Sequence, residues 1–143
     1  VRTSFAQSRA MGCYACLAGV DEDLLTSFLQ RQVRDDAISH IGQRIGPLLS
    51  DWMENPPRLF VYGAGEHSKV LLGLYPILWK WIVAFVDGRR REPFLGKPCF
   101  TPDAVDFGVD ATVLYSSREH QEEMYDRMKC SRVKHVRIYP AKS

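Results

Sequence analysis

The sequence lacks any apolar run long enough to cross a membrane. A transmembrane helix needs about 20 predominantly apolar residues, whereas the longest apolar stretch, LYPILWKWIVAFV (residues 74–86), is interrupted by Pro76 and Lys80. The first 20 residues combine basic and weakly apolar positions but lack the leucine-rich core of a signal peptide. We therefore expect a cytoplasmic protein that does not interact with a membrane.

The sequence also lacks a strong charge of either sign, because the formal net charge of its 143 residues is only +2. The single basic run, Arg89–Arg91, is short, and its simplest interpretation is a solvated turn. Nucleic acid is therefore not an expected partner. The hydrophobic fraction of 45% and the charged fraction of 25% are those of an ordinary globular domain.

Cysteine is scarce, with four residues at Cys13, Cys16, Cys99 and Cys130. The first two form a C-x-x-C pair, which suggests either a thioredoxin-like redox motif or half of a zinc site. No expected strand precedes the pair, as a redox motif requires, and the other two cysteines are too isolated to complete four zinc ligands. We interpret the pair as structural or incidental and expect no metal site.

Residues 24–53 carry apolar side chains at spacings of three and four, the period of an amphipathic helix. The acidic run 21–23 lies at the start, where it favours the helix dipole. Gly42 and the pair Gly46–Pro47 weaken a continuous helix, so the pattern fits one helix or two. We expect the apolar face to lie on the domain or to pair with a second copy in a homodimer.

After a proline-rich link at 54–58, short apolar runs typical of strands buried on both faces alternate with helical patterns. The expected strands are 59–62, 82–86, 97–100, 111–115 and 135–139. The expected helices are 66–75 and 118–129, with a shorter helical turn at 101–105. This alternation predicts an α/β, Rossmann-like three-layer domain over 57–143, with a mainly parallel sheet of about five strands in the order 3-2-1-4-5. Residues 1–56 form an α-helical N-terminal extension in this interpretation.

The segment RLFVYGAGEHSKVLLGLY (residues 58–75) joins the first expected strand to its helix through Gly63, Ala64 and Gly65. Gly63 allows the sharp turn, and Gly65 allows a ligand to approach the backbone. The unpaired amides and dipole of the helix start favour an anion such as phosphate. Ser68 stands at the third position of the G-x-G-x-x-G motif, where a small residue lets helix and strand pack closely.

Asp87 ends the second expected strand about 20 residues after Gly65, where a ribose-binding carboxylate belongs in this fold. Two features oppose an ordinary dinucleotide site. Glu66 brings a negative charge beside the expected phosphate and repels it unless its side chain turns away. The region 57–143 is also too short to hold a second mononucleotide half and a catalytic domain, both of which a hydride-transfer enzyme needs.

These segments resemble the small Rossmann-like nucleotide-sugar-binding domain of sugar O- and N-acyltransferases of the PglD type. They are also similar to modules of sugar C-methyltransferases and polysaccharide-biosynthesis proteins. The similarity spans roughly residues 58–139 and rests on four short motifs. These are the glycine turn followed by His67, the FVD strand end at 85–87, the G-K-P segment at 96–98, and an apolar strand that ends in Ser116 and Ser117.

The resemblance implies that Gly63, Gly65 and His67 line the phosphate side and that Asp87 contacts the ribose or the sugar. Ser116 and Ser117 would close the crevice. Together with the motif itself, this predicts a binding site for a nucleotide-sugar or NAD(P) made of Gly63, Ala64, Gly65, Glu66, His67, Ser68, Asp87, Arg89, Ser116 and Ser117. In the family a separate β-helix domain performs the transfer, and its hexapeptide repeats are absent from this sequence. The resemblance therefore implies a module that is non-catalytic alone and part of, or partner to, a sugar-modifying enzyme.

Other interpretations remain open. The chain could be a small NAD(P)-dependent oxidoreductase or a sugar transferase subunit with His67 as its catalytic base, or His67 could be an exposed histidine without a role. It could also be a dimerising interaction module with a vestigial glycine turn. An arginine of the run 89–91 could clamp a diphosphate.

Ser116 and Glu119 form a capping-box pattern at the start of the last expected helix.

Overall fold

The computed structural model describes residues 22–141 of the chain. The chain divides into two compact units, Val1–Asp36 and Ala37–Ser143, and the second unit holds all the strands that the described residues form. The division predicted from the sequence, between residues 56 and 57, falls between the last N-terminal helix and the first strand. The second unit therefore includes helical residues from the predicted extension.

The N-terminal helical segment breaks at the residues that the sequence marks as helix breakers. Helix α1 (Glu22–Ile45) ends where the short 3-10 helix η1 (Gly46–Leu48) begins, and η1 leads into α2 (Leu49–Glu54). Pro47 lacks the backbone N–H that would continue α1. The interpretation with two helices is therefore confirmed, whereas Gly42 stays inside α1 without interrupting it.

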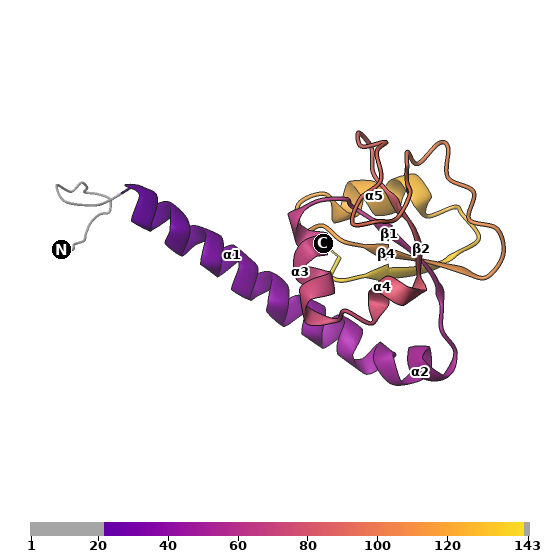
Figure 1. Cartoon of the computed structure of the whole chain (residues 1–143), viewed down its shortest axis with the longest axis horizontal. Helices are drawn as coiled ribbons and strands as arrows, with labels where there is room; N and C mark the ends of the chain where they lie inside the picture. Colours follow the sequence, from indigo (N-terminus) through magenta and orange to yellow (C-terminus); the bar gives the residue numbers. More distant parts are fainter. Residues whose placement is uncertain (1–21, 142–143) are drawn as a thin grey trace. The chain divides into compact units, whose positions relative to one another are not determined.

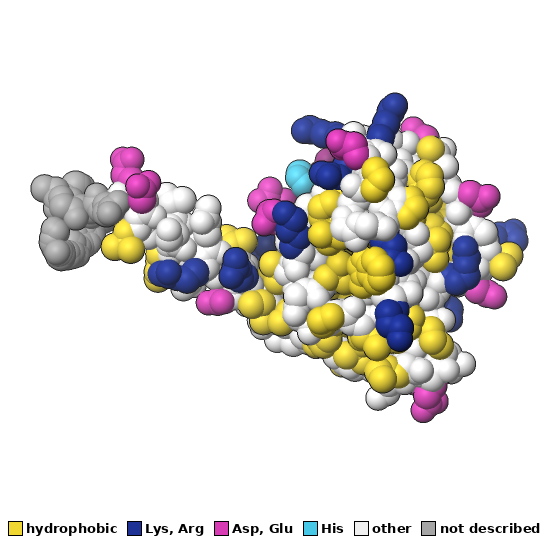
Figure 2. Space-filling model, in the orientation of Figure 1, with side chains coloured by type: hydrophobic (Ala, Val, Ile, Leu, Met, Phe, Trp, Pro, Cys, Tyr) yellow, Lys and Arg dark blue, Asp and Glu magenta, His cyan; other side chains and the backbone are white. Residues whose placement is uncertain are grey.

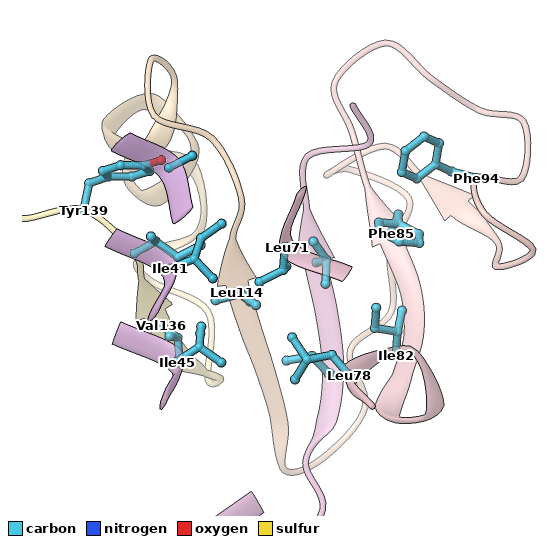
Figure 3. Close-up of a cluster of buried hydrophobic side chains, with 14 of the residues drawn as sticks. Ile41, Ile45, Leu71, Leu78, Ile82, Phe85, Phe94, Leu114, Val136 and Tyr139 are labelled. Atoms are coloured by element: carbon cyan, nitrogen blue, oxygen red, sulfur yellow. The ribbon is translucent and has the colours of Figure 1, made fainter. Parts of the chain in front are cut away.

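Only the C-terminal part of the apolar stripe on α1 is buried. Ala37, Ile41 and Ile45 belong to the main hydrophobic cluster of the second unit, and Figure 3 shows Ile41 and Ile45 within it. The large apolar side chains between Leu24 and Val33 are exposed. The expectation that the stripe lies on the domain is thus confirmed for residues 37–45.

A five-stranded parallel sheet forms the centre of the second unit. Its strands are β1 (Arg58–Tyr62), β2 (Ile82–Val86), β3 (Cys99–Phe100), β4 (Ala111–Tyr115) and β5 (Lys134–Arg137). They lie in the order β3-β2-β1-β4-β5, which confirms the predicted fold class and strand order. Tyr62 pairs with Val86 on one side and with Tyr115 on the other, so β1, β2 and β4 end at the same level and their following loops meet at one edge.

Helices cover both faces of the sheet (Figure 1). They are α3 (Glu66–Leu74), α4 (Leu78–Trp81) and α5 (Gln121–Met128). Leu71 of α3 and Leu78 of α4 join the cluster that contains the end of α1, whereas Met128 of α5 joins a second cluster. Alternate residues of β1 belong to the two clusters, and because successive side chains of a strand point to opposite faces, the clusters lie on opposite sides. The result is a three-layer domain.

The structure differs from the sequence expectation in small elements. Residues 101–105 form a single hydrogen-bonded turn where the sequence predicts a short helical turn, with the amides of Ala104 and Val105 both donating to the carbonyl of Thr101. Helix α4 was not expected. Within residues 22–141, no helix combines the length and apolarity that crossing a bilayer requires. On the face shown in Figure 2, basic and acidic side chains are interspersed among apolar ones.

Candidate functional site

The turn after β1 brings the backbones of β1 and β4 into close contact. Gly63 has a φ of 122°, a conformation that side chains disfavour, and its N–H donates to the carbonyl of Val86 (2.7 Å). A Cβ atom at this position would lie 2.5 Å from the carbonyl oxygen of Ser116. Glycine is therefore required at position 63 by the fold itself.

Gly65, at the start of α3, has a different environment. It is the N-cap residue of α3, and no side chain caps the first turn. A Cβ atom added at Gly65 would meet nothing within 4 Å. The packing of the described residues therefore does not require glycine here, and the space beside the first amides of α3 is open.

Glu66 does not block this space. Its carboxylate accepts a hydrogen bond from Lys69 Nζ (3.0 Å), and its side chain is 88% exposed. This pair, three residues apart on the surface of α3, keeps the carboxylate on the solvent side. The repulsion of a phosphate that the sequence suggested is thus reduced by the orientation of Glu66 and by the lysine charge beside it.

Asp87 lies beside the glycine turn, as the motif predicts, but its carboxylate is bound by the main chain. Oδ2 accepts from the N–H of Ala64 (3.0 Å), and Oδ1 accepts from the amides of Arg89 and Arg90 (2.9 Å each). Burial raises the pKa of Asp87, but the three amide donors and the Arg90 charge lower it, and the net pKa is below its usual value. Asp87 is therefore an ionised anchor that joins the loop after β2 to the glycine turn and occupies one of the turn amides.

His67, on the first turn of α3, reaches across to the end of β4. Its Nδ1 is hydrogen-bonded to Ser116 Oγ (2.7 Å), and Ser116 Oγ is hydrogen-bonded to Ser68 Oγ (2.9 Å). Ser68 Oγ also lies 2.5 Å from the carbonyl oxygen of Gly63. These hydroxyls and the imidazole form one polar network beneath the turn, and Ser116 is only 3% exposed.

Tyr139 completes this network, although no motif in the sequence marks it. Its hydroxyl is hydrogen-bonded to His67 Nε2 (2.7 Å). The buried Gln121 side chain holds the main chain of Tyr139 through two hydrogen bonds, donating to its carbonyl (2.8 Å) and accepting from its amide (2.9 Å). The partners in this network lie between residues 63 and 139. Because no short motif contains residues so far apart in the sequence, pattern analysis could not have found the network.

The environment of His67 keeps its imidazole neutral at physiological pH. Burial lowers the pKa of His67 to about 4. A neutral imidazole has one donor and one acceptor nitrogen, so one of its two partners, Ser116 and Tyr139, donates to the ring and the other accepts from it. Both nitrogens are therefore engaged, and an exposed histidine without a role is not what the structure shows.

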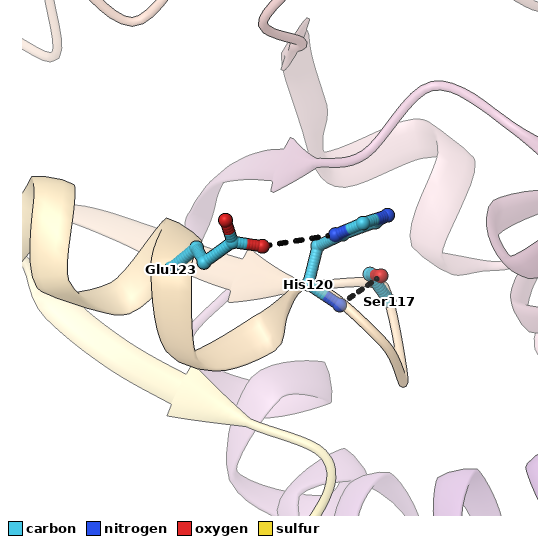
Figure 4. A network of polar contacts seen from close by, with 3 residues as sticks. All are labelled: Ser117, His120 and Glu123. Carbon is cyan, nitrogen blue, oxygen red and sulfur yellow. Dashed lines mark hydrogen bonds and ion pairs between the residues drawn. The ribbon is translucent and has the colours of Figure 1, made fainter.

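The loop after β4 corrects the predicted start of the last helix. Ser116 does not cap a helix, because its hydroxyl contacts His67 and Ser68. Ser117 Oγ instead accepts the N–H of His120 (3.0 Å), and α5 begins one residue later. His120 Nδ1 in turn lies 3.0 Å from a carboxylate oxygen of Glu123 (Figure 4). Ser117 therefore shapes the loop, and the capping-box interpretation of Ser116 and Glu119 is wrong.

The remaining candidate groups are the possible metal ligands and the cysteines. Within residues 22–141, no group of three or more His, Cys, Asp or Glu side chains could hold a metal ion. Cys99 is a buried free thiol and Cys130 an exposed one. The C-x-x-C pair, Cys13 and Cys16, lies outside the described residues.

The parallel sheet, its strand order and the glycine turn together define a Rossmann-like α/β domain, in which the strand order reverses between β1 and β4. Comparisons with protein-family models, with curated proteins and with solved structures found no match to this chain. The ligand class is therefore argued from the site.

Proposed function

We propose that the chain is a binding module for a nucleotide or nucleotide-sugar, with a phosphate group at the N-terminus of α3. The observation that carries this proposal is the uncapped first turn of α3 with open space beside Gly65, at the point where the strand order reverses. Helix N-termini bind anions through free amides and the helix dipole. Ligands of open α/β sheets bind at such reversal points.

The charges around the turn support an anionic ligand. Asp87 joins the loop carrying Arg89 and Arg90 to the glycine turn through its bonds to both. Arg89 is exposed on this loop, and Arg118 is exposed on the loop after β4. An arginine on either side suits a diphosphate, because guanidinium groups bind phosphate oxygens in pairs.

In this proposal the module is non-catalytic alone and serves as part of, or partner to, a sugar-modifying enzyme. The engagement of both ring nitrogens of His67 argues against a catalytic base, since either hydrogen bond would have to break before the imidazole could take a substrate proton. Ser116 is too buried to act as a nucleophile. His67 is therefore assigned as a positioning residue that holds β4 against the glycine turn.

Calorimetry tests the proposal directly. The chain is titrated with UDP-, TDP- and CMP-sugars and with NAD and NADP, and we expect saturable heat with at least one of them. Gly65→Ala should weaken that affinity about tenfold by placing a methyl group beside the α3 amides. Gly73→Ala is the matched control, because Gly73 lies exposed near the far end of the same helix and a Cβ there meets nothing within 4 Å. The absence of binding heat with every ligand at millimolar concentration would overturn the proposal, and so would equal effects of the two variants on affinity.

A second candidate function is dimerisation through α1. The exposed apolar side chains between Leu24 and Val33 favour it, whereas Ala37, Ile41 and Ile45 are already buried in the second unit. The homodimer predicted through residues 24–53 is therefore proposed only for residues 24–33. Light scattering tests it: Leu29→Glu should reduce the mass of an assembly that Gln30→Glu leaves intact, and a monomeric wild-type chain would exclude it.

A further inference from the structure

A groove separate from the glycine turn lies between the end of α1 and β5, the edge strand of the sheet. It has a volume of about 470 Å³, within the range of roughly 300–1,000 Å³ typical of small-molecule sites. Its polar lining comes from both elements and the residues after β5, and consists of His40, Gln43, Arg44, His135, Arg137 and Tyr139. The function proposed above makes no use of it.

The charged residues in the lining are all of one sign. The groove is lined by two arginines and two histidines, and by no aspartate or glutamate. Arg44 is half-buried, and its Nε donates to the main-chain carbonyl of Arg137 (2.9 Å). This bond fixes the guanidinium against the edge strand, and no other described residue binds its terminal Nη groups. A fixed guanidinium with free donors is a binding element for carboxylate or phosphate oxygens.

His135 and Arg137 line the groove at the edge strand, but their side chains lie on the other face of the sheet. The His135 ring stacks on Tyr115 and contacts Tyr125, and the Arg137 guanidinium lies over the Tyr125 ring. Val136 between them belongs to the cluster that holds the end of α1, whereas Tyr115 and Tyr125 belong to the second cluster. Arg44 is therefore the fixed cationic group on the α1 side of the groove.

The wall formed by α1 is held in place by ring packing. The rings of His40 and Tyr139 lie 4.8 Å apart between centroids. Tyr139 is itself anchored by Gln121, and its hydroxyl is hydrogen-bonded to His67. The groove is therefore built from residues whose positions are set by the core and by the polar network, which favours a preformed site.

We propose that this groove is a second site, which binds a small anionic molecule through carboxylate or phosphate oxygens, with Arg44 as its principal contact. The volume fits a small molecule, and the lining includes the fixed Arg44 guanidinium and no aspartate or glutamate.

The test is an NMR titration of the full ¹⁵N-labelled chain with two probes, inorganic phosphate and malonate, at constant pH and ionic strength. The Arg44 Nε–H signal reports on the groove itself, so binding at the glycine turn is not mistaken for it. We expect a saturable shift of this signal with at least one probe, and the probe that acts separates phosphate from carboxylate recognition. The absence of saturable shifts with both probes overturns the proposal.

Two pairs of variants locate the effect. Arg44→Gln should weaken binding about tenfold or more, as loss of a charge-assisted hydrogen bond does, whereas Arg34→Gln removes the same charge from an exposed position of α1 outside the groove. Gln43→Glu introduces a negative charge at an exposed lining position and should also weaken binding, with Gln32→Glu as its control. If Arg44→Gln fails to fold, the comparison of Gln43→Glu with Gln32→Glu still tests the site. Equal effects of variant and control in either pair would indicate general screening and overturn the site.

Discussion

The two sides of the glycine turn differ in what the fold demands of them. On one side, Gly63, Ser68 and Ser116 are buried and joined by backbone contact and hydrogen bonds. On the other, Gly65 borders open space and Glu66 is turned to solvent. One short motif thus has a closed, buried side, which the packing of the fold requires, and an open side, which this packing does not use. We infer that a ligand would bind on the open side, at Gly65.

The largest expected effect is on the closed side. Gly63→Ala places a Cβ 2.5 Å from a main-chain oxygen of Ser116 and strains a positive φ, so it should lower the free energy of unfolding by about 3 kcal/mol or more. Urea denaturation measures this. A loss below about 1 kcal/mol would show that the two strands can separate at this point without disrupting the fold.

Lowering the pH should destabilise the fold through His67, which lies on the closed side. The pKa of His67 is lowered to about 4 in the folded chain, whereas an unfolded histidine titrates near 6.5. Between these values the unfolded chain binds more protons, so stability is complete above about pH 7 and should fall by about 2–3 kcal/mol as the pH drops to about 4. The pKa of Asp87 is also lowered, so its contribution is lost only below the ordinary aspartate pKa of about 3.9.

Urea denaturation between pH 7 and pH 4 measures this effect, and His67→Gln is the control. Glutamine keeps a donor and an acceptor for Ser116 and Tyr139 but does not titrate. The variant should therefore show a flatter dependence over this range. The same slope in both proteins would assign the effect to other groups.

Removing one hydroxyl of the network should have an intermediate effect. Ser116→Ala leaves the buried Ser68 and the imidazole of His67 short of a partner, which should cost about 1–3 kcal/mol. The adjacent Ser117→Ala removes only a bond to the exposed His120 and should cost about 1 kcal/mol or less. Thermal unfolding of the two variants side by side gives the comparison, and equal losses would contradict the assigned network.

The smallest effect is expected on the open side. Gly65→Ala meets no atom of the fold, so the free energy of unfolding should stay within about 0.5 kcal/mol of the wild type or rise slightly. Urea denaturation checks this under the conditions used for Gly63→Ala. A large destabilisation would mean that the open space is filled in solution, and would remove the basis for a ligand there.

Much of the fold could be predicted from the sequence because its signals are local. Short continuous apolar runs, the helical spacing of three and four, and the alternation of strand and helix patterns predicted the fold class and the strand order. The break at Gly46–Pro47 predicted the end of the first helix. The position of the glycine turn followed from the same reasoning. The short helix α4 was missed because four residues carry too weak a pattern.

The candidate site was predictable only in part. The residues on the glycine turn and Asp87 were placed together because the carboxyl ends of neighbouring parallel strands meet at one edge. The partners of their side chains were not, since Asp87 binds three amides and His67 binds Tyr139, a residue with no motif. Such choices depend on which polar groups become buried together.

By itself, the sequence determined where the chain turns, where its helices break and which residues alternate towards a core, because these depend on the conformational preferences of neighbouring residues. Only the tertiary structure decided that Gly63 packs against Ser116 while Gly65 borders open space, and that the apolar stripe of α1 is buried only from Ala37 onward. It also brought α1 and β5 together around a groove that Arg44 lines and that has no aspartate or glutamate in its lining. The physical reason is that packing and desolvation act between residues far apart in the chain, and no local pattern records which of them will meet.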